Sequence, residues 1–185
     1  MIDELLDDAA ARMTKSVDST RGEFATVRTG RATPHLLDRI TVDYYGTETP
    51  LDQMANVAAT EARVLTVTPY DKSAIAMIEK AILDSDVGLT PNNDGNVIRL
   101  GIPEMTEERR QELVKVLHGI AEEGRVAVRN VRRDVMGDLR ELKKEGEAGA
   151  DDEHRAENRL QQLTDQAIEE IDAMLKGKEE EILEV

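Results

Sequence analysis

The residues best suited to binding chemistry in this sequence are the arginines of RVAVRNVRR, residues 125–133. The stretch places Arg125, Arg129, Arg132 and Arg133 within nine residues and contains no acidic residue. A guanidinium group binds phosphate through two hydrogen bonds and can stack on a nucleobase, whereas a lysine ammonium group supplies only charge. The type and spacing of these side chains therefore favour a nucleic acid as partner, with an acidic protein as the alternative.

The rest of the chain is acidic, with 24 Lys and Arg residues against 39 Asp and Glu residues and a formal net charge of −15. Most of the imbalance lies near the end of the chain, because residues 147–185 hold 13 acids and four bases while residues 105–146 hold nine acids and ten bases. A negative net charge slows association with polyanions, but the location of the charge matters more than its sum. A solvated helix face is the third interpretation of the arginines, although such faces normally mix charge signs.

A long amphipathic helix is predicted to position the arginines. Apolar residues recur at steps of three and four, which predicts a continuous helix over residues 107–145, about 58 Å long at 1.5 Å per residue. On an ideal helical wheel the four arginines and Arg140 lie within an arc of about 100°, away from the apolar seam. We therefore expect one solvent-facing row of arginines. The predicted seam consists of Leu113, Leu117, Ile120, Gly124, Ala127, Val131, Val135, Leu139 and Leu142.

Two further helices, over residues 2–29 and about 153–183, show similar apolar stripes. Residues 31–104 differ, with β-rich segments at 40–46, 63–69 and 96–103 and a short helical pattern at 71–83. The sequence therefore predicts an α+β fold, in which residues 1–30 and 105–185 form a discontinuous three-helix bundle and residues 31–104 form an inserted α/β domain. Two short connections that lie close together make a natural hinge. Its predicted residues are Thr29, Gly30, Arg31, Pro103, Glu104 and Met105.

Catalytic, metal and cofactor sites are not predicted. The chain has no cysteine, and its three histidines show no metal-ligand spacing with one another or with other ligands. No Gly-rich phosphate loop of the GxxxxGK[ST] type occurs. Tyr44 and Tyr45 could stack on single-stranded RNA, but neighbours in a strand face opposite sides, so we interpret the pair as structural. We expect no enzyme activity and no cofactor.

Several long segments of the sequence resemble the ribosome recycling factor family. They are VRTGRATPHLLDRITVDYYGTETPL, EKAILDSDVGLTPNNDG, IPEMTEERR and VAVRNVRRD, and the match extends over essentially the whole chain. The resemblance implies a near-L-shaped protein with a three-helix bundle and a small α/β domain inserted after the first helix. It also implies a factor that enters the ribosome after termination, rests on large-subunit ribosomal RNA and, with elongation factor G and GTP, splits the complex into subunits.

The resemblance assigns contacts with ribosomal RNA to Arg28 in VRTGR, Arg110 in TEERR, and Arg129 and Arg132 in VRNVRRD. We add Arg125 and Arg133 from the same predicted row as further contacts. We also add Arg31, for which a role in the hinge is the alternative. The alternative for Arg28 and Arg110 is a structural role, since both lie near the junction of the domains and could pair with acids there.

The acidity of the chain departs from the family pattern. It suggests either weaker affinity at ordinary salt or a host that works at raised salt, in which case the melting temperature should climb with added KCl. The competing function is an acidic coiled-coil adaptor or chaperone that does not bind ribosomes. The acidic N-terminal segment and the lack of a long apolar segment predict a cytoplasmic protein without a membrane partner. We expect a monomer, because three helices satisfy one another's apolar seams.

Overall fold

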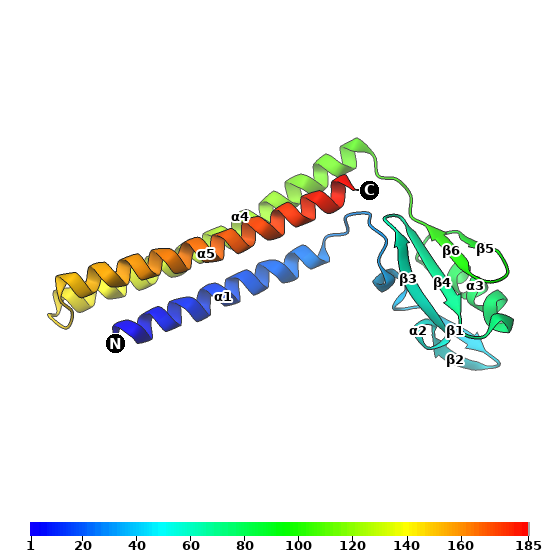
Figure 1. Cartoon of the computed structure of the whole chain (residues 1–185), viewed down its shortest axis with the longest axis horizontal. Coiled ribbons are helices and arrows are strands. Elements are labelled where there is room, and N and C mark those ends of the chain that lie inside the picture. The colour runs from blue at the N-terminus through cyan, green and yellow to red at the C-terminus, as the bar shows by residue number, and fades with distance from the viewer. Residues whose placement is uncertain (185) are drawn as a thin grey trace. The chain divides into compact units, whose positions relative to one another are not determined.

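Three long helices run alongside one another in the first unit of the chain (Figure 1). They are α1 (Ile2–Thr26), α4 (Glu107–Lys144) and α5 (Ala150–Leu183). The computed structural model describes residues 1–184, and the chain divides into two units. The first unit comprises residues 1–28 and 108–180, and the second comprises residues 29–107 with those from 181 onward. The three long helices and the inserted strands confirm the predicted α+β class.

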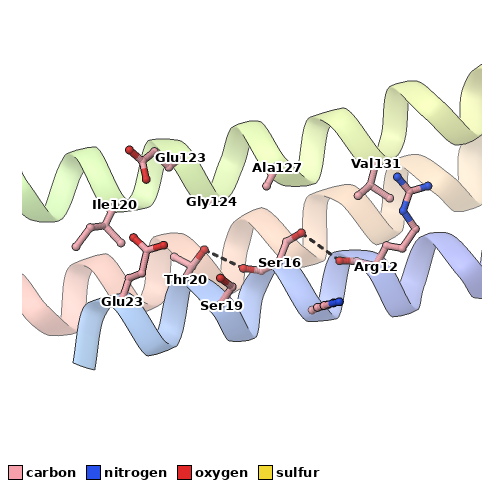
Figure 2. A pocket seen from close by; sticks show the side chains of 11 residues that line it. Arg12, Ser16, Ser19, Thr20, Glu23, Ile120, Glu123, Gly124, Ala127 and Val131 are labelled. Atoms are coloured by element: carbon pink, nitrogen blue, oxygen red, sulfur yellow. Dashed lines mark hydrogen bonds between the residues drawn. The ribbon is translucent and has the colours of Figure 1, made fainter. Parts of the chain in front are cut away.

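The buried face of α4 is rotated slightly from the predicted seam. Ala121 and Val128 are fully buried, whereas the predicted Ile120, Ala127 and Leu142 are only half-buried. The reason is that α4 packs against two helices: Ile120 and Ala127 line a groove between α4 and α1 instead of the centre of the bundle (Figure 2). The buried residues of α4 are Leu113, Leu117, Ala121, Gly124, Val128, Val131, Val135 and Leu139.

The three helices approach one another closely at Gly124. A Cβ atom added to this residue would lie 2.4 Å from Thr20 Oγ1 of α1 and 3.1 Å from Ile171 Cδ1 of α5. Thr20 of α1 is a polar residue in the core, since it is buried and its hydroxyl donates to the Ser16 carbonyl at 2.9 Å (Figure 2). Glycine at this position lets a polar side chain pack where a larger residue would clash.

The helix α5 begins at Ala150, three residues earlier than predicted, directly after the connection from α4. Its first turn carries Asp151, Asp152 and Glu153, and acidic side chains are favourable at a helix N-terminus because of the helix dipole. Glu153 is buried and pairs with Lys143 of α4. The three acidic side chains therefore favour the start of α5 at this point of the chain.

The second unit contains two antiparallel sheets and a short helix. The hairpin consists of β1 (Thr41–Tyr44) and β2 (Thr47–Pro50), and a four-stranded sheet has the order β3-β4-β6-β5. Helix α3 (Ile75–Asp84) buries Ile78 and Ile82 in the core that it shares with Leu65, Val67 and Leu100. The sheet is formed by β3 (Ala55–Glu61), β4 (Val64–Pro69), β6 (Ile98–Gly101) and β5 (Pro91–Asn93). Short helical turns occupy Pro34–Leu37, Leu51–Met54 and Lys72–Ala74.

The structure confirms the predicted strands at 40–46, 63–69 and 96–103 as β1, β4 and β6, and the helical pattern at 71–83 as α3 with the turn before it. Strands β2, β3 and β5 were not predicted from the sequence. Of the two tyrosines interpreted as structural, Tyr44 is half-buried against the core, but Tyr45 is 76% exposed. Tyr45 also has a positive φ of 51°, which is unusual for a residue with a large side chain.

Candidate nucleic-acid interface

The arginines of RVAVRNVRR all lie on α4, but they are not equally exposed. The expectation of one fully solvent-facing row was wrong, because Arg125 and Arg132 are half-buried while Arg129 and Arg133 are exposed. The rotation of the seam explains this difference. With Ala121 and Val128 in the core, the centre of the buried face moves about 20–30° towards Arg125 and Arg132 on the helical wheel.

Arg125 is held by an acid from another helix. Its Nε and Nη2 atoms both donate to Asp172 Oδ1 of α5, at 2.9 and 2.6 Å, and its Nη1 atom donates to Glu122 Oε2 at 3.2 Å. The side chain is only 19% exposed. The hydrogen bond with Asp172, followed by that with Glu122, raises the pKa of Arg125 above its ordinary value. The stretch that is free of acids in the sequence is therefore not free of acids in space.

Arg129 shares one of these acids. Its Nη1 atom donates to Glu122 Oε1 at 3.2 Å, so the carboxylate of Glu122 contacts two guanidinium groups one turn apart. Hydrogen bonds from Arg125 first, and then from Arg129, lower the pKa of Glu122 below its ordinary value. Glu122 therefore stays ionised and neutralises part of the charge at this end of the row.

Arg132 and Arg133, at the other end of the row, make no ion pair and no hydrogen bond through their side chains within residues 1–184. The Nε atom of Arg132 is buried and lacks a hydrogen-bond partner in this part of the chain. Buried polar groups are nearly always paired in folded proteins, so an unpaired guanidinium nitrogen is a feature that needs an explanation. The positive charge at this end of the row is therefore not paired with an acidic side chain of residues 1–184.

The other predicted contact residues lie elsewhere in the first unit. Arg28 is exposed just beyond α1 and forms no ion pair within the described part of the chain. Arg110 is half-buried in the first turn of α4. Arg140, which belongs to the predicted row but not to the predicted contact residues, is exposed about two turns beyond Arg133 on the same helix. The six predicted contact residues therefore come from α4 and from the end of α1, and four of them lie on one stretch of α4.

The predicted hinge residues belong to the second unit. Thr29 is buried and its hydroxyl donates to Glu181 Oε2 at 3.1 Å, while Arg31 pairs with Glu184 at 3.4 Å. Gly30 has a φ of 77°, and a Cβ atom there would lie 3.0 Å from the Met105 side chain. Of the second connection, Pro103 and Glu104 are exposed. The positive φ of Gly30 is a backbone conformation that other residues rarely adopt, and it lies in the segment that follows α1.

No group of three or more His, Cys, Asp or Glu side chains within residues 1–184 could hold a metal ion. In the same part of the chain, no helix combines the length and the apolar character that crossing a membrane requires. A groove of about 550 Å³ lies between α1 and α4, lined by both cationic and anionic side chains (Figure 2). Its Arg12 is already engaged by Asp134 at 2.8 Å and by Asp8. The arginine row is therefore the strongest candidate for a functional site.

Two residues of this site were missed from the sequence. Glu122 precedes Arg125 by three residues, the spacing at which side chains meet on a helix, so a wider window around the arginines would have included it. Asp172 is 47 residues from Arg125 and on another helix, and nothing in the sequence indicates that pair.

The fold and the site together describe an α+β protein with a three-helix bundle, an inserted antiparallel unit and a partly compensated arginine row. The profile of the family described as ribosome recycling factor matches residues 20–183. The ribosome-recycling factor of Desulforamulus reducens is 56% identical over 185 residues, 100% of both chains. The chain therefore belongs to the ribosome recycling factor family.

Solved structures show the same likeness. A solution structure of a ribosome recycling factor is 40% identical, with a TM-score of 0.69, and the match covers 100% of this chain and 98% of that one. A second structure is 44% identical, with a TM-score of 0.63 and coverage of 99% of each chain. It represents the T. thermophilus ribosome recycling factor and the E. coli elongation factor G bound to the E. coli post-termination complex.

Proposed function

We propose that this chain recycles ribosomes after termination. It binds the post-termination ribosome through the arginines of α4, which contact phosphates of large-subunit ribosomal RNA. With elongation factor G and GTP it promotes separation of the ribosome into subunits. It acts in the cytoplasm, as a monomer, and contributes no catalytic group of its own.

The observation that carries this proposal is the uncompensated end of the arginine row. Arg132 and Arg133 have no acidic partner within residues 1–184, although the chain has 39 acids and compensates Arg125 and Arg129 on the same helix. Guanidinium groups bind phosphate bidentately, and contacts with phosphates dominate the affinity for nucleic acids. Membership of the family and the likeness to a factor bound to the post-termination complex support the same function.

The length and packing of α4 support a mechanical role for the bundle. The helix has 38 residues, which corresponds to about 57 Å at 1.5 Å per residue, and its buried face is packed over most of that length. In this proposal the bundle acts as a strut on ribosomal RNA. The hinge consists of the two connections Thr29–Arg31 and Pro103–Met105. It joins the three-helix bundle (residues 1–30 and 105–185) to the inserted domain (residues 31–104). The hinge lets elongation factor G move the inserted domain, and the energy comes from GTP hydrolysis by that partner.

The test is subunit dissociation in a purified system. Light scattering would follow 70S ribosomes carrying a deacylated tRNA after addition of this protein, elongation factor G and GTP. We expect scattering to fall only when all components are present, and the Arg132→Ala variant to lose at least about tenfold in rate at subsaturating concentration. Arg155→Ala is the matched control, because it removes the same charge from an exposed position on α5.

Full dissociation without this protein, or equal rates with the wild type and Arg132→Ala, would overturn the proposal in its present form. Absence of any binding to ribosomes at low salt would favour the adaptor or chaperone function instead.

A further inference from the structure

Glu122 occupies a position between two arginines that a phosphate group could take. Its two carboxylate oxygens each lie 3.2 Å from a guanidinium nitrogen, Oε2 from Arg125 Nη1 and Oε1 from Arg129 Nη1. A carboxylate and a phosphate offer the same kind of acceptor oxygens to guanidinium groups. The protein therefore already fills, with its own side chain, one anion position of the row that is proposed to contact RNA.

The two acids of this cluster hold their arginines with different strength. Asp172 Oδ1 accepts from both Nε and Nη2 of Arg125, and the Arg125 side chain is only 19% exposed. Glu122 and Arg129 are 55% and 51% exposed and share one contact. Exposed ion pairs contribute little to stability, so the pair of Glu122 with Arg129 can be exchanged at small cost, while that of Asp172 with Arg125 is a fixed part of the bundle.

We propose that Glu122 is a built-in counter-ion of the arginine row. It occupies Arg129 in the free protein and is exchanged for a phosphate of RNA when the row is engaged. The inference rests on the proposed function, and it adds a residue that tunes the affinity of the site. Arg132 and Arg133 make the first contacts, because they need no exchange, and Arg129 follows once RNA is held close.

This exchange has a consequence for the salt dependence of binding. Each phosphate that a free cation neutralises releases a condensed counter-ion, and this contributes about 0.7–0.9 to the slope of log K against log salt concentration. When Arg129 leaves Glu122 for a phosphate, the RNA releases a condensed cation, while Glu122 keeps its contact with Arg125. Arg129 therefore contributes the same salt dependence whether or not Glu122 holds it in the free protein, so Glu122 lowers the affinity without changing the slope.

The experiment compares Glu122→Gln with Glu123→Gln in binding to 70S ribosomes over a series of KCl concentrations. Both substitutions remove one negative charge from neighbouring positions of α4. Glu123 is exposed, lines the groove facing α1, and forms no ion pair within residues 1–184. Both variants therefore change the net charge by the same amount, and only Glu122→Gln frees Arg129.

We expect Glu122→Gln to bind about two- to fivefold more tightly than Glu123→Gln at moderate salt. We expect the salt slopes of both variants to stay close to that of the wild type, because the number of phosphates contacted is unchanged. Thermal unfolding of both variants serves as the control that the bundle is intact. In the background of Arg129→Ala, the difference between Glu122→Gln and Glu123→Gln should disappear.

Equal affinities for Glu122→Gln and Glu123→Gln would overturn the inference while leaving the proposed function in place. A difference that persists without Arg129 would also overturn it, because the effect would then pass through another residue. Wild-type protein that fails to bind ribosomes, or binds without salt dependence, would overturn the proposed function and the inference with it.

Discussion

The face of α4 that points towards α1 and α5 carries small and apolar side chains, whereas the outward side carries the arginines. On the inner face Gly124 and Val128 are buried, and the space around Gly124 is too small for a Cβ atom. On the outer side the charges are compensated at Arg125 and Arg129 and uncompensated at Arg132 and Arg133. The difference indicates that one helix can be divided into residues that set stability and residues that set binding.

The largest effect on stability is expected at the inner face. Gly124→Ala should lower the free energy of unfolding by about 1–3 kcal/mol, since the new methyl group would overlap Thr20 and Ile171. Urea denaturation would measure the change. Gly119→Ala is the matched control, because its Cβ atom would meet nothing within 4 Å on the exposed side, and it should raise stability by up to about 1 kcal/mol. If Gly124→Ala were as stable as the wild type, the helices would not pack as tightly around Gly124 as described here.

Arg125 lies at the border between the buried face of α4 and the side that carries the arginines. Its substitution therefore tests whether it contributes mainly to stability or mainly to binding. Arg125→Ala should lower the free energy of unfolding by about 1 kcal/mol, because it removes the hydrogen bonds to Asp172 and the packing of the aliphatic stem. Its effect on ribosome affinity should be smaller than that of Arg132→Ala. Unchanged stability together with a large loss of affinity would place Arg125 on the binding side instead.

Added salt should raise the thermal stability of the protein and lower its affinity for ribosomes. The change in stability should be the smallest of the effects predicted here. Added KCl screens the repulsion that accompanies a net charge of −15, so the melting temperature should rise by about 2–4 °C between low and moderately high salt. The affinity for ribosomes should fall over the same range. Calorimetry in KCl, with sucrose of equal osmolarity as control, would check the first statement. A flat or falling melting temperature would remove the hypothesis of adaptation to raised salt.

The helices of the bundle could be predicted from the sequence because their apolar residues recur over many turns. The boundaries of α4, Glu107–Lys144, differ from the predicted 107–145 by one residue. Local periodicity could not decide which of two neighbouring residues is the core position, Ile120 or Ala121 and Ala127 or Val128. That depends on how α4 packs against the two other helices. The same rotation decides which arginines are half-buried.

The strands that were missed carry weak local signals. β2 is TETP, with a charge and a proline, and β3 is ANVAATE, with one β-branched apolar residue and an edge position in its sheet. Their pairing is set by partners elsewhere in the chain, Thr49 opposite Val42 and Val57 opposite Val67. The ion pair of Arg125 with Asp172 is likewise a product of the tertiary fold, so the sequence could indicate the arginines but not which of them are neutralised.

The measurement that tests the central claim most directly is co-sedimentation with 70S ribosomes across a KCl series. Wild type, Arg132→Ala and the control Arg155→Ala would be compared at equal concentrations. We predict binding that weakens as salt rises, a loss of about tenfold or more for Arg132→Ala, and near wild-type binding for Arg155→Ala. Equal binding by Arg132→Ala and the wild type would contradict the assignment of the uncompensated end of α4 as the RNA-contacting surface.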